Sequence, residues 1–294
     1  MVASIRAVAV LGTGTMGRGI AQVTASAGLS TRVCDVEPGR AAEAVATVES
    51  QLEKRVGKGT MTSEERDGAL AALRVAAGIR DACDGVDLVI EAVPESMELK
   101  VKLLGEALLV SPRQALMGSN TSSLSLTELG ARIGAPERTV GLHFFNPAPV
   151  MELLEIVRGF ATSDAAVESA RSFAERIGKT PIVVRDVPGF ASSRLGVILG
   201  AEAIRMLESG VASALDIDRA MELGYRHPMG PLKLTDLVGL DVRLAILDHL
   251  HRELGETFRA PPLLRQMVHA GKLGKKSGEG FYLWKDGVAH PRTG

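Results

Sequence analysis

The sequence predicts an α/β protein with an N-terminal Rossmann-like domain, built on a doubly wound, mostly parallel sheet, and a C-terminal all-helical domain. Apolar β-rich runs alternate with helical patterns before Pro188-Gly189-Phe190, and such alternation is typical of parallel sheets covered by helices. After this point the strand signal almost disappears and amphipathic helices follow. We therefore predict two domains, residues 1–186 and 187–294. The predicted strands are residues 7–11, 31–34, 88–92, 115–119, 140–144, 153–157 and 182–184.

Composition excludes several classes of partner. The chain has 294 residues, of which 46% are hydrophobic and 23% charged, as expected of a soluble globular protein. Its formal net charge of −1 provides no basic field for nucleic acid or anionic lipid. The chain has no apolar run of about 18 residues and little room for a signal peptide before the first strand, so we expect a cytoplasmic protein without a membrane partner. We expect Cys34 and Cys83 to be reduced and buried, and no metal site.

A glycine-rich turn follows the first predicted strand and opens a helical pattern. Gly12 permits a tight turn, Gly14 lacks the Cβ that would hold a pyrophosphate away from the backbone, and Gly17 lets the helix pack on the strand. Asp35 closes the second predicted strand, where a carboxylate can accept hydrogen bonds from both ribose hydroxyls and would repel a 2′-phosphate. The order of strand, glycine turn, helix and acid favours NAD over NADP, and over a glycine loop without a ligand. The turn comprises Gly12, Thr13, Gly14, Thr15, Met16 and Gly17.

Polar residues gather where further strands end. His143 closes one predicted strand, Asn146 follows it by three residues, and Glu155 stands near the end of the next strand. A neutral imidazole can take a proton from an alcohol as hydride leaves the same carbon, while a carboxylate fixes the tautomer and stabilises the imidazolium. A strand-end histidine alone is more often structural, but pairing with Glu155 and the cofactor motif favour a general base. Ser122, after the strand at residues 115–119, belongs to the same group.

These motifs resemble the L-3-hydroxyacyl-CoA dehydrogenase family, and most closely its short bacterial 3-hydroxybutyryl-CoA dehydrogenases. The resemblance spans essentially the whole chain, and the run from His143 through Phe144 and Phe145 to Asn146 and Pro147 is more specific than the glycine turn. The matching motifs are residues 12–17, 91–95, 119–124, 141–147, 188–190, 227–231, 236–241 and 274–278.

The resemblance implies reversible, NAD-dependent oxidation of an L-3-hydroxyacyl-CoA to the 3-ketoacyl-CoA without a metal. It assigns the general base to His143 and its orientation to Glu155. Ser122 is implied to contact both the substrate and the nicotinamide, and Asn146 to line the same site.

Further binding residues follow from the same resemblance. Glu95, Lys100 and Lys276 are associated with the dinucleotide, and Lys54 and Lys58 with the phosphates of CoA. Independently, Lys54 and Lys58 are four residues apart on one helical face, so both ammonium groups can reach one polyphosphate. A solvated helix face is the alternative for these two lysines.

One position departs from the family pattern. Ser193 stands where the family usually has an asparagine that reaches the substrate and the catalytic histidine. Serine is shorter and has no amide, so it can replace that contact only through a water molecule or a closer approach. Loss of one direct hydrogen bond would cost about 1 kcal/mol, which weakens catalysis without abolishing it. We therefore expect Ser193 in the substrate site, with the acyl group left open.

The C-terminal domain has more apolar helical surface than a small domain needs for its own core. We predict a helix over residues 231–250, and its leucines, together with the family resemblance, favour a homodimer over a self-contained bundle. Two other functions remain open. One is NAD-dependent oxidation of a free 3-hydroxy acid or sugar acid, as in the gulonate dehydrogenase and lambda-crystallin branch, and the other is dinucleotide binding without catalysis.

Overall fold

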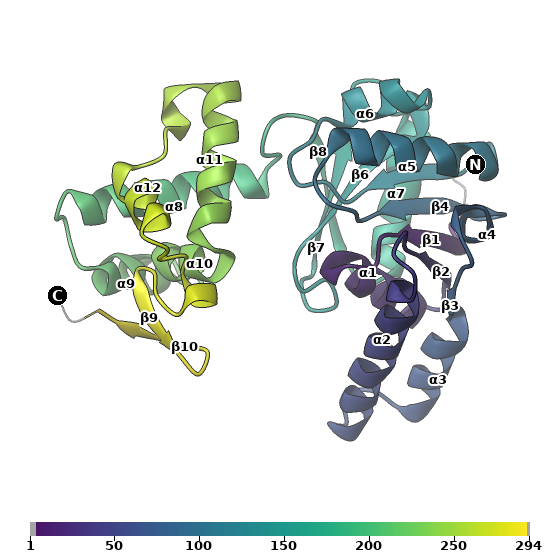
Figure 1. Cartoon of the computed structure of the whole chain (residues 1–294), viewed down its shortest axis with the longest axis horizontal. Helices are drawn as coiled ribbons and strands as arrows, with labels where there is room; N and C mark the ends of the chain where they lie inside the picture. Colours follow the sequence, from purple (N-terminus) through teal and green to yellow (C-terminus); the bar gives the residue numbers. More distant parts are fainter. Residues whose placement is uncertain (1–3, 293–294) are drawn as a thin grey trace. The chain divides into compact units, whose positions relative to one another are not determined.

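The computed structural model describes residues 4–292 and divides the chain into two compact units, Met1–Val187 and Pro188–Gly294 (Figure 1). The division lies one residue after the boundary expected from the sequence. No helix within the described residues is both long and apolar enough to cross a membrane. Cys34 and Cys83 are both buried free thiols, as predicted.

The first unit is built on an eight-stranded sheet with the order β3-β2-β1-β4-β5-β6-β7-β8. All neighbouring strands are parallel except β6 and β7, which pair antiparallel. The central strands β1 and β4 are almost entirely buried, as expected where helices cover both faces of a parallel sheet. The strands are β1 Ala7–Leu11, β2 Ser30–Cys34, β3 Leu73–Val75, β4 Leu88–Glu91, β5 Leu116–Ser119, β6 Thr139–Phe144, β7 Leu153–Arg158 and β8 Thr180–Arg185.

The predicted strands of this sheet are confirmed to within two residues at each end, and one strand was missed. Strand β3 has only three residues, and two of them are exposed, so it carries almost no apolar pattern. The direction of β7 also corrects the placement of Glu155. Glu155 is the third of the six residues of β7, so it lies in the first half of its strand and not near the carboxyl end. Because β7 runs antiparallel to β6, this first half lies beside the end of β6, which carries His143.

Helices flank the sheet and mostly begin at polar caps. The Thr62 side chain accepts from the backbone N–H of Glu65, whose side chain accepts from the Thr62 N–H, a reciprocal capping box before α3. Ser96, Ser125 and Ser163 cap α5, α6 and α7 in the simpler way. The helices of this unit are α1 Thr15–Ser26, α2 Arg40–Gly57, α3 Ser63–Ala72, α4 Ile79–Cys83, α5 Met97–Val110, α6 Leu126–Ile133 and α7 Asp164–Arg176, with a short 3₁₀ turn at Pro136–Arg138.

The second unit is mainly helical, but two of its elements differ from the prediction. Gly239, with φ of +106°, breaks the helix expected over residues 231–250 into α10 Pro231–Val238 and α11 Leu240–Leu254, because this backbone conformation is open mainly to glycine. The domain is also not all-helical, since β9 Tyr282–Lys285 and β10 Val288–Pro291 form an antiparallel hairpin. The other helices are α8 Ser192–Glu208, α9 Ala214–Gly224 and α12 Pro262–His269, with 3₁₀ turns at Glu256–Phe258 and Lys275–Ser277.

Two buried carboxylates anchor the C-terminal segment of this unit. Asp236 accepts from the backbone N–H groups of Phe281 and Tyr282 at 2.8 and 2.9 Å and from Trp284 Nε1 at 2.9 Å. Asp218 accepts from Tyr282 Oη at 2.7 Å. Burial raises the pKa of both carboxyls, although these hydrogen bonds oppose the shift. Phe281 and Tyr282 are themselves buried, at 3% and 1% exposure, so this segment is part of the core of the unit.

Candidate active site

The glycine turn between β1 and α1 has the geometry expected of a dinucleotide-binding loop. Gly12 has φ of +91°, a backbone conformation that favours glycine. A Cβ on Gly17 would lie 1.8 Å from Gly12 O, so Gly17 must be glycine for the helix to pack against the turn. A Cβ on Gly14 would meet no protein atom within 4 Å and would instead extend into open space. The structure thus separates two roles: Gly12 and Gly17 close the turn, and Gly14 keeps its outer side open for a ligand.

Asp35 is held beside this turn by Thr13. The backbone N–H and the hydroxyl of Thr13 both donate to Asp35 Oδ2 at 2.7 Å, and the N–H of Glu37 donates to Oδ1 at 3.1 Å. Burial raises the pKa of the Asp35 carboxyl, but these hydrogen bonds and the charge of Arg40 outweigh burial and lower it overall. Asp35 is therefore a fixed carboxylate at neutral pH.

A pocket of about 440 Å³ lies beside the glycine turn and Asp35. Its walls combine the N-terminus of α1 with apolar residues after β4 and on α5, so it offers a polar and an apolar side to a nucleotide. The first N–H groups of α1 have no partner within the helix and favour an anion there. These features fit NAD, and the pocket is lined by Leu11, Gly12, Thr13, Gly14, Thr15, Met16, Cys34, Asp35, Val36, Glu37, Arg40, Ile79, Ala92, Val93, Pro94, Leu99 and Leu103.

The ends of β1, β4 and β5 lie in register at one edge of the sheet, where Leu11 pairs with Glu91 and Glu91 with Ser119. Glu91 is fully buried there and accepts from Lys100 Nζ at 2.9 Å through both oxygens and from the Ser119 hydroxyl. Lys100 is only 1% exposed and also lies 3.3 Å from Glu95. The Lys100 ammonium therefore faces two carboxylates, those of Glu91 and Glu95. The residue pattern did not predict a role for Glu91.

Glu95 organises the turn that carries Ser122. Its Oε1 accepts from the Thr121 hydroxyl at 2.7 Å, from the Ser122 N–H and hydroxyl at 2.9 and 3.2 Å, and from the Ser123 N–H and hydroxyl at 3.1 and 3.0 Å. Burial raises the pKa of Glu95, but Lys100 and these hydrogen bonds reverse the shift and lower it. Ser122 is therefore positioned by Glu95, a contact that residue spacing did not predict.

His143 and Glu155 lie directly opposite each other in the antiparallel pairing of β6 and β7. Their Nδ1 and Oε2 atoms are 2.7 Å apart, Glu155 is fully buried, and His143 is 7% exposed. A carboxylate at this distance favours the tautomer in which Nδ1 donates, so proton exchange with a substrate falls to Nε2. This geometry agrees with an oriented general base.

The segment after β6 brings Asn146 to the same edge of the sheet. Asn146 is exposed and precedes a cis peptide bond to Pro147. Asn120 joins this region to the Ser122 turn, because its Oδ1 accepts from the N–H of Phe144 at 3.0 Å. The sequence pattern did not assign Asn120, although it lies within a motif that supported the family resemblance.

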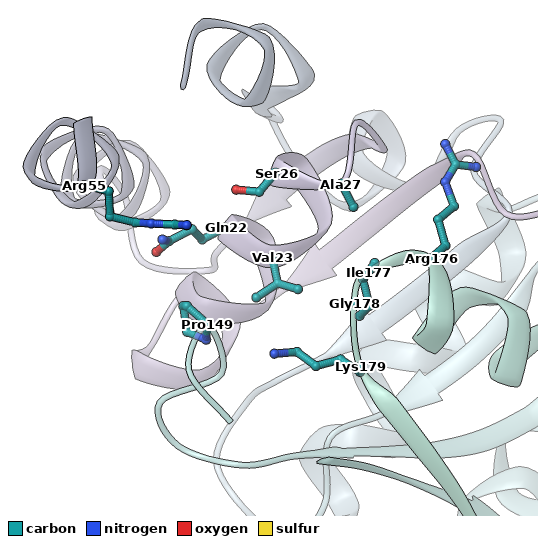
Figure 2. Close-up of a pocket in the computed structure, with 10 residues that line it drawn as sticks. All are labelled: Gln22, Val23, Ser26, Ala27, Arg55, Pro149, Arg176, Ile177, Gly178 and Lys179. Carbon is teal, nitrogen blue, oxygen red and sulfur yellow. The ribbon is translucent and has the colours of Figure 1, made fainter. Parts of the chain in front are cut away.

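A second pocket of the first unit, of about 330 Å³, lies between α1, the end of α2 and the turn before β8 (Figure 2). Its buried Lys179 points toward Pro149, and its Nζ donates to the carbonyls of Ala148 and Met151 at 2.7 Å each. Lys179 therefore fixes the loop that carries Asn146. The lining residues, none of which was predicted as a site residue, are Gln22, Val23, Ser26, Ala27, Arg55, Pro149, Arg176, Ile177, Gly178 and Lys179.

The remaining predicted residues lie elsewhere. Lys54 and Lys58 are exposed at the end of α2, and neither lines the pocket beside the glycine turn. Ser193 and Lys276 belong to the second unit. Ser193 is the second residue of α8 and is half-buried, and Lys276 Nζ lies 2.6 Å from Asp241 Oδ2.

A doubly wound sheet with a glycine turn, a ribose-side carboxylate and a histidine–carboxylate pair at one edge defines an NAD-dependent oxidoreductase. Residues 7–187 match the model of the 3-hydroxyacyl-CoA dehydrogenase NAD-binding domain, and residues 189–284 match that of the C-terminal domain. The chain therefore belongs to the 3-hydroxyacyl-CoA dehydrogenase family.

Relatives and solved structures agree with this membership. The chain is 42% identical to a 3-hydroxybutyryl-CoA dehydrogenase of Bradyrhizobium diazoefficiens over 97% of each chain. It is 43% identical to a 3-hydroxybutyryl-CoA dehydrogenase of Mycobacterium tuberculosis over 96% of this chain and 99% of the relative. It also resembles the crystal structure of (S)-3-hydroxybutyryl-CoA dehydrogenase PaaH1 from Ralstonia eutropha, with a TM-score of 0.92, 40% identity, and coverage of 96% of this chain and 100% of that one.

Proposed function

We propose that this dehydrogenase reversibly oxidises short L-3-hydroxyacyl-CoA thioesters, such as 3-hydroxybutyryl-CoA, to the 3-oxoacyl-CoA with NAD. The observation that carries the proposal is the pairing of His143 with Glu155 at 2.7 Å in the unit that also holds the glycine turn and Asp35. The names of relatives that cover nearly the whole chain support the short acyl group.

His143 acts as the general base in this proposal. NAD, held at the glycine turn and Asp35, would supply the acceptor for the hydride that leaves C3 of the substrate. His143 Nε2 takes the proton of the C3 hydroxyl as the carbonyl forms, so the products are ketone, NADH and a proton. Glu155 stabilises the positive charge that develops on the ring, and in the reverse direction the protonated His143 returns its proton to the oxygen.

Ser122 and Asn146 position the reacting oxygen atoms. Both residues are exposed at the edge of the sheet where β5 and β6 end, and both side chains can donate a hydrogen bond. Because the Ser122 hydroxyl already donates a hydrogen bond to Glu95, its side chain has less orientational freedom to lose when the substrate binds. Ser122 and Asn146 would also hold the nicotinamide of bound NAD, and Glu95, Lys100 and Lys276 would support the dinucleotide.

The CoA moiety is bound through charge in this proposal. Lys54 and Lys58 are exposed, and neither forms a salt bridge with any residue between 4 and 292, so both ammonium groups can bind the CoA phosphates. Ser193 contacts the substrate from α8, with a shorter reach than the asparagine that usually stands there.

We further propose that the protein is a homodimer through its second unit and works in the cytoplasm. Leu232 and Leu240 are fully buried in the core of that unit, but Leu237, Val238 and Val242 are 40–43% exposed on either side of the break at Gly239. Adjacent exposed apolar side chains of this kind favour association. Analytical ultracentrifugation tests this part, and a stable monomer at micromolar concentration contradicts it.

The reaction itself is tested by NADH oxidation with acetoacetyl-CoA, beside free acetoacetate and with NADPH as the cofactor control. The proposal predicts rapid turnover that requires both the thioester and NADH. Turnover of free acetoacetate at the same efficiency would favour a free 3-hydroxy acid as the substrate. Binding of NADH without turnover of either compound would favour a dinucleotide-binding protein without this catalysis.

A further inference from the structure

Glu91 and Lys100 form a buried ion pair between the end of β4 and α5. Glu91 is fully buried and Lys100 is 1% exposed, and Lys100 Nζ lies 2.9 Å from both carboxylate oxygens. The Ser119 hydroxyl and the backbone N–H of Val93 also donate to Glu91, the latter at 3.2 Å. Because desolvation of two charges offsets most of their attraction, a buried pair of this kind adds little net stability. We therefore expect its main effect on the groups that it holds in place.

Lys100 faces carboxylates and a carbonyl rather than the dinucleotide pocket. The pocket beside the glycine turn takes Leu99 from α5, whereas Lys100 does not line it. Besides its contacts with Glu91, Lys100 Nζ donates to the Val93 carbonyl at 3.4 Å and lies 3.3 Å from Glu95 Oε2. An ammonium has three N–H groups, and these contacts use all of them.

The two oxygens of Glu95 have different partners. Oε2 lies beside Lys100, and Oε1 accepts from the N–H and the hydroxyl of Ser122 at 2.9 and 3.2 Å and from neighbouring residues of the same turn. Burial raises the pKa of Glu95, and the charge of Lys100 is the largest of the effects that reverse this shift. The Glu95 side chain is 36% exposed, so without the cation it would be free to turn toward solvent. Lys100 therefore keeps Glu95 charged and directed at Ser122.

We infer that Glu91 and Lys100 are positioning residues for Ser122, which they orient through Glu95 without contacting the substrate or the dinucleotide. The chain of contacts is continuous. Glu91 fixes the Lys100 ammonium, the ammonium fixes one oxygen of Glu95, and the other oxygen fixes the Ser122 hydroxyl. This inference rests on the proposed function, in which Ser122 positions the reacting oxygen atoms. It also narrows that function, because Lys100 then supports the dinucleotide only indirectly.

The test is a double-mutant cycle between the ion pair and Ser122, with reduction of acetoacetyl-CoA by NADH as the assay. Lys100→Met alone would leave the Glu91 carboxylate buried without its cation and would destabilise the protein. The main variant is therefore Glu91→Gln combined with Lys100→Met, which removes both charges. It is made in the wild type and in Ser122→Ala, and thermal unfolding shows that each protein is folded. Lys102→Met, which removes an exposed lysine from the same helix, is the control.

We expect removal of the pair to lower kcat by about ten- to a hundredfold in the wild type, because the Ser122 hydroxyl is no longer held in one orientation. In Ser122→Ala the same two substitutions should lower kcat by less than about threefold further, since the group that they orient is already gone. The Kd of NADH, from fluorescence titration, should rise by less than about threefold, because the glycine turn and Asp35 are unchanged. Lys102→Met should behave as the wild type.

Three results would overturn the inference. An equal loss of kcat in both backgrounds would indicate a general structural role. A rise of at least about tenfold in the Kd of NADH in both backgrounds would make Lys100 a direct ligand of the dinucleotide. Wild-type kcat after removal of the pair would show that Ser122 does not need it. Turnover of acetoacetyl-CoA by the wild type keeps the proposed function in each case, whereas its absence removes both.

Discussion

Glu155 holds His143 from the facing position of the neighbouring antiparallel strand, with 2.7 Å between Oε2 and Nδ1. The pair sits on two regular strands, so its geometry is fixed by the backbone register rather than by a loop. This rigidity explains how a residue twelve positions further along the chain can orient the base.

Loss of the base should reduce catalysis without affecting cofactor binding. His143→Gln should lower kcat by about a hundred- to ten-thousandfold, because no other group is assigned to take the hydroxyl proton. Glu155→Gln should lower kcat by roughly ten- to a hundredfold, the value of one charge-assisted hydrogen bond. Steady-state kinetics and NADH fluorescence titration measure the two effects. Normal turnover of His143→Gln would remove this residue as the base.

The glycine turn predicts different outcomes at two of its positions. Gly14→Ala should fold with unchanged stability, because the new Cβ meets no protein atom within 4 Å, yet it should weaken NADH binding by at least about tenfold by obstructing the pyrophosphate. Gly17→Ala should destabilise the unit itself, because its Cβ would lie 1.8 Å from Gly12 O. Thermal unfolding and NADH titration separate the two roles. Wild-type affinity in Gly14→Ala would show that the pyrophosphate does not lie over this turn.

Cofactor choice should depend on Asp35. Val36 is 81% exposed beside it and lines the same pocket, so Asp35→Ser combined with Val36→Arg replaces a repelling carboxylate by a cation that can bind a 2′-phosphate. The ratio of kcat/KM for NADPH to that for NADH should rise by at least about tenfold. The single Val36→Arg variant is the control, and an unchanged ratio in the double variant would show that Asp35 does not contact the ribose.

Stability should depend on pH through Glu95. Its pKa is lower in the folded protein than the ordinary value of 4.5, because Lys100 and hydrogen bonds from residues 121–123 outweigh the effect of burial. The folded state therefore holds this proton less tightly than the unfolded state, so the stabilisation is present above pH 4.5 and disappears as the pH falls below it. Because the Glu95 side chain is 36% exposed, solvent screens these interactions, and Glu95→Gln should destabilise the protein by no more than about 1 kcal/mol at neutral pH and by less in acid, as measured by urea unfolding. An equal difference at both pH values would contradict a charge effect.

The second unit should be sensitive to a single methyl group at Gly280. A Cβ there would lie 2.1 Å from Asp236 Oδ1, where the carboxylate binds the C-terminal segment. Gly280→Ala should cost about 3 kcal/mol or more, or prevent folding of this unit. Gly224→Ala, at the last position of α9 with no protein atom within 4 Å of the new Cβ, should change stability by less than about 1 kcal/mol. Equal thermal stability of the two variants would show that the segment is not held by Asp236.

The sequence predicted those parts of the fold that leave a local pattern. Buried strands such as β1 and β4 were found because their apolar runs are bounded by turns, and His143 and Glu155 were paired because they fall on consecutive strands. The short strand β3 and the break at Gly239 were missed because tertiary packing decides them. The β9–β10 hairpin did have a signal, since Asp286-Gly287 is a common turn pair and both residues have positive φ.

Side-chain partners were harder to predict than strands. Residue spacing does not reveal that Lys100 is buried against Glu91, because burial depends on the tertiary structure. Nor does it reveal that Glu95 binds three consecutive residues of the Ser122 turn, because that turn lies more than twenty residues further along the chain.

The most direct test of the proposed function is oxidation of the two enantiomers of 3-hydroxybutyryl-CoA with NAD, followed by NADH absorbance. The account predicts turnover of the (S) enantiomer, which is the L form, with the (R) enantiomer and NADP at least about a hundredfold less efficient, because His143 accepts the proton from one face of a fixed site. Equal rates with both enantiomers, or no NADH formed from either, would contradict it.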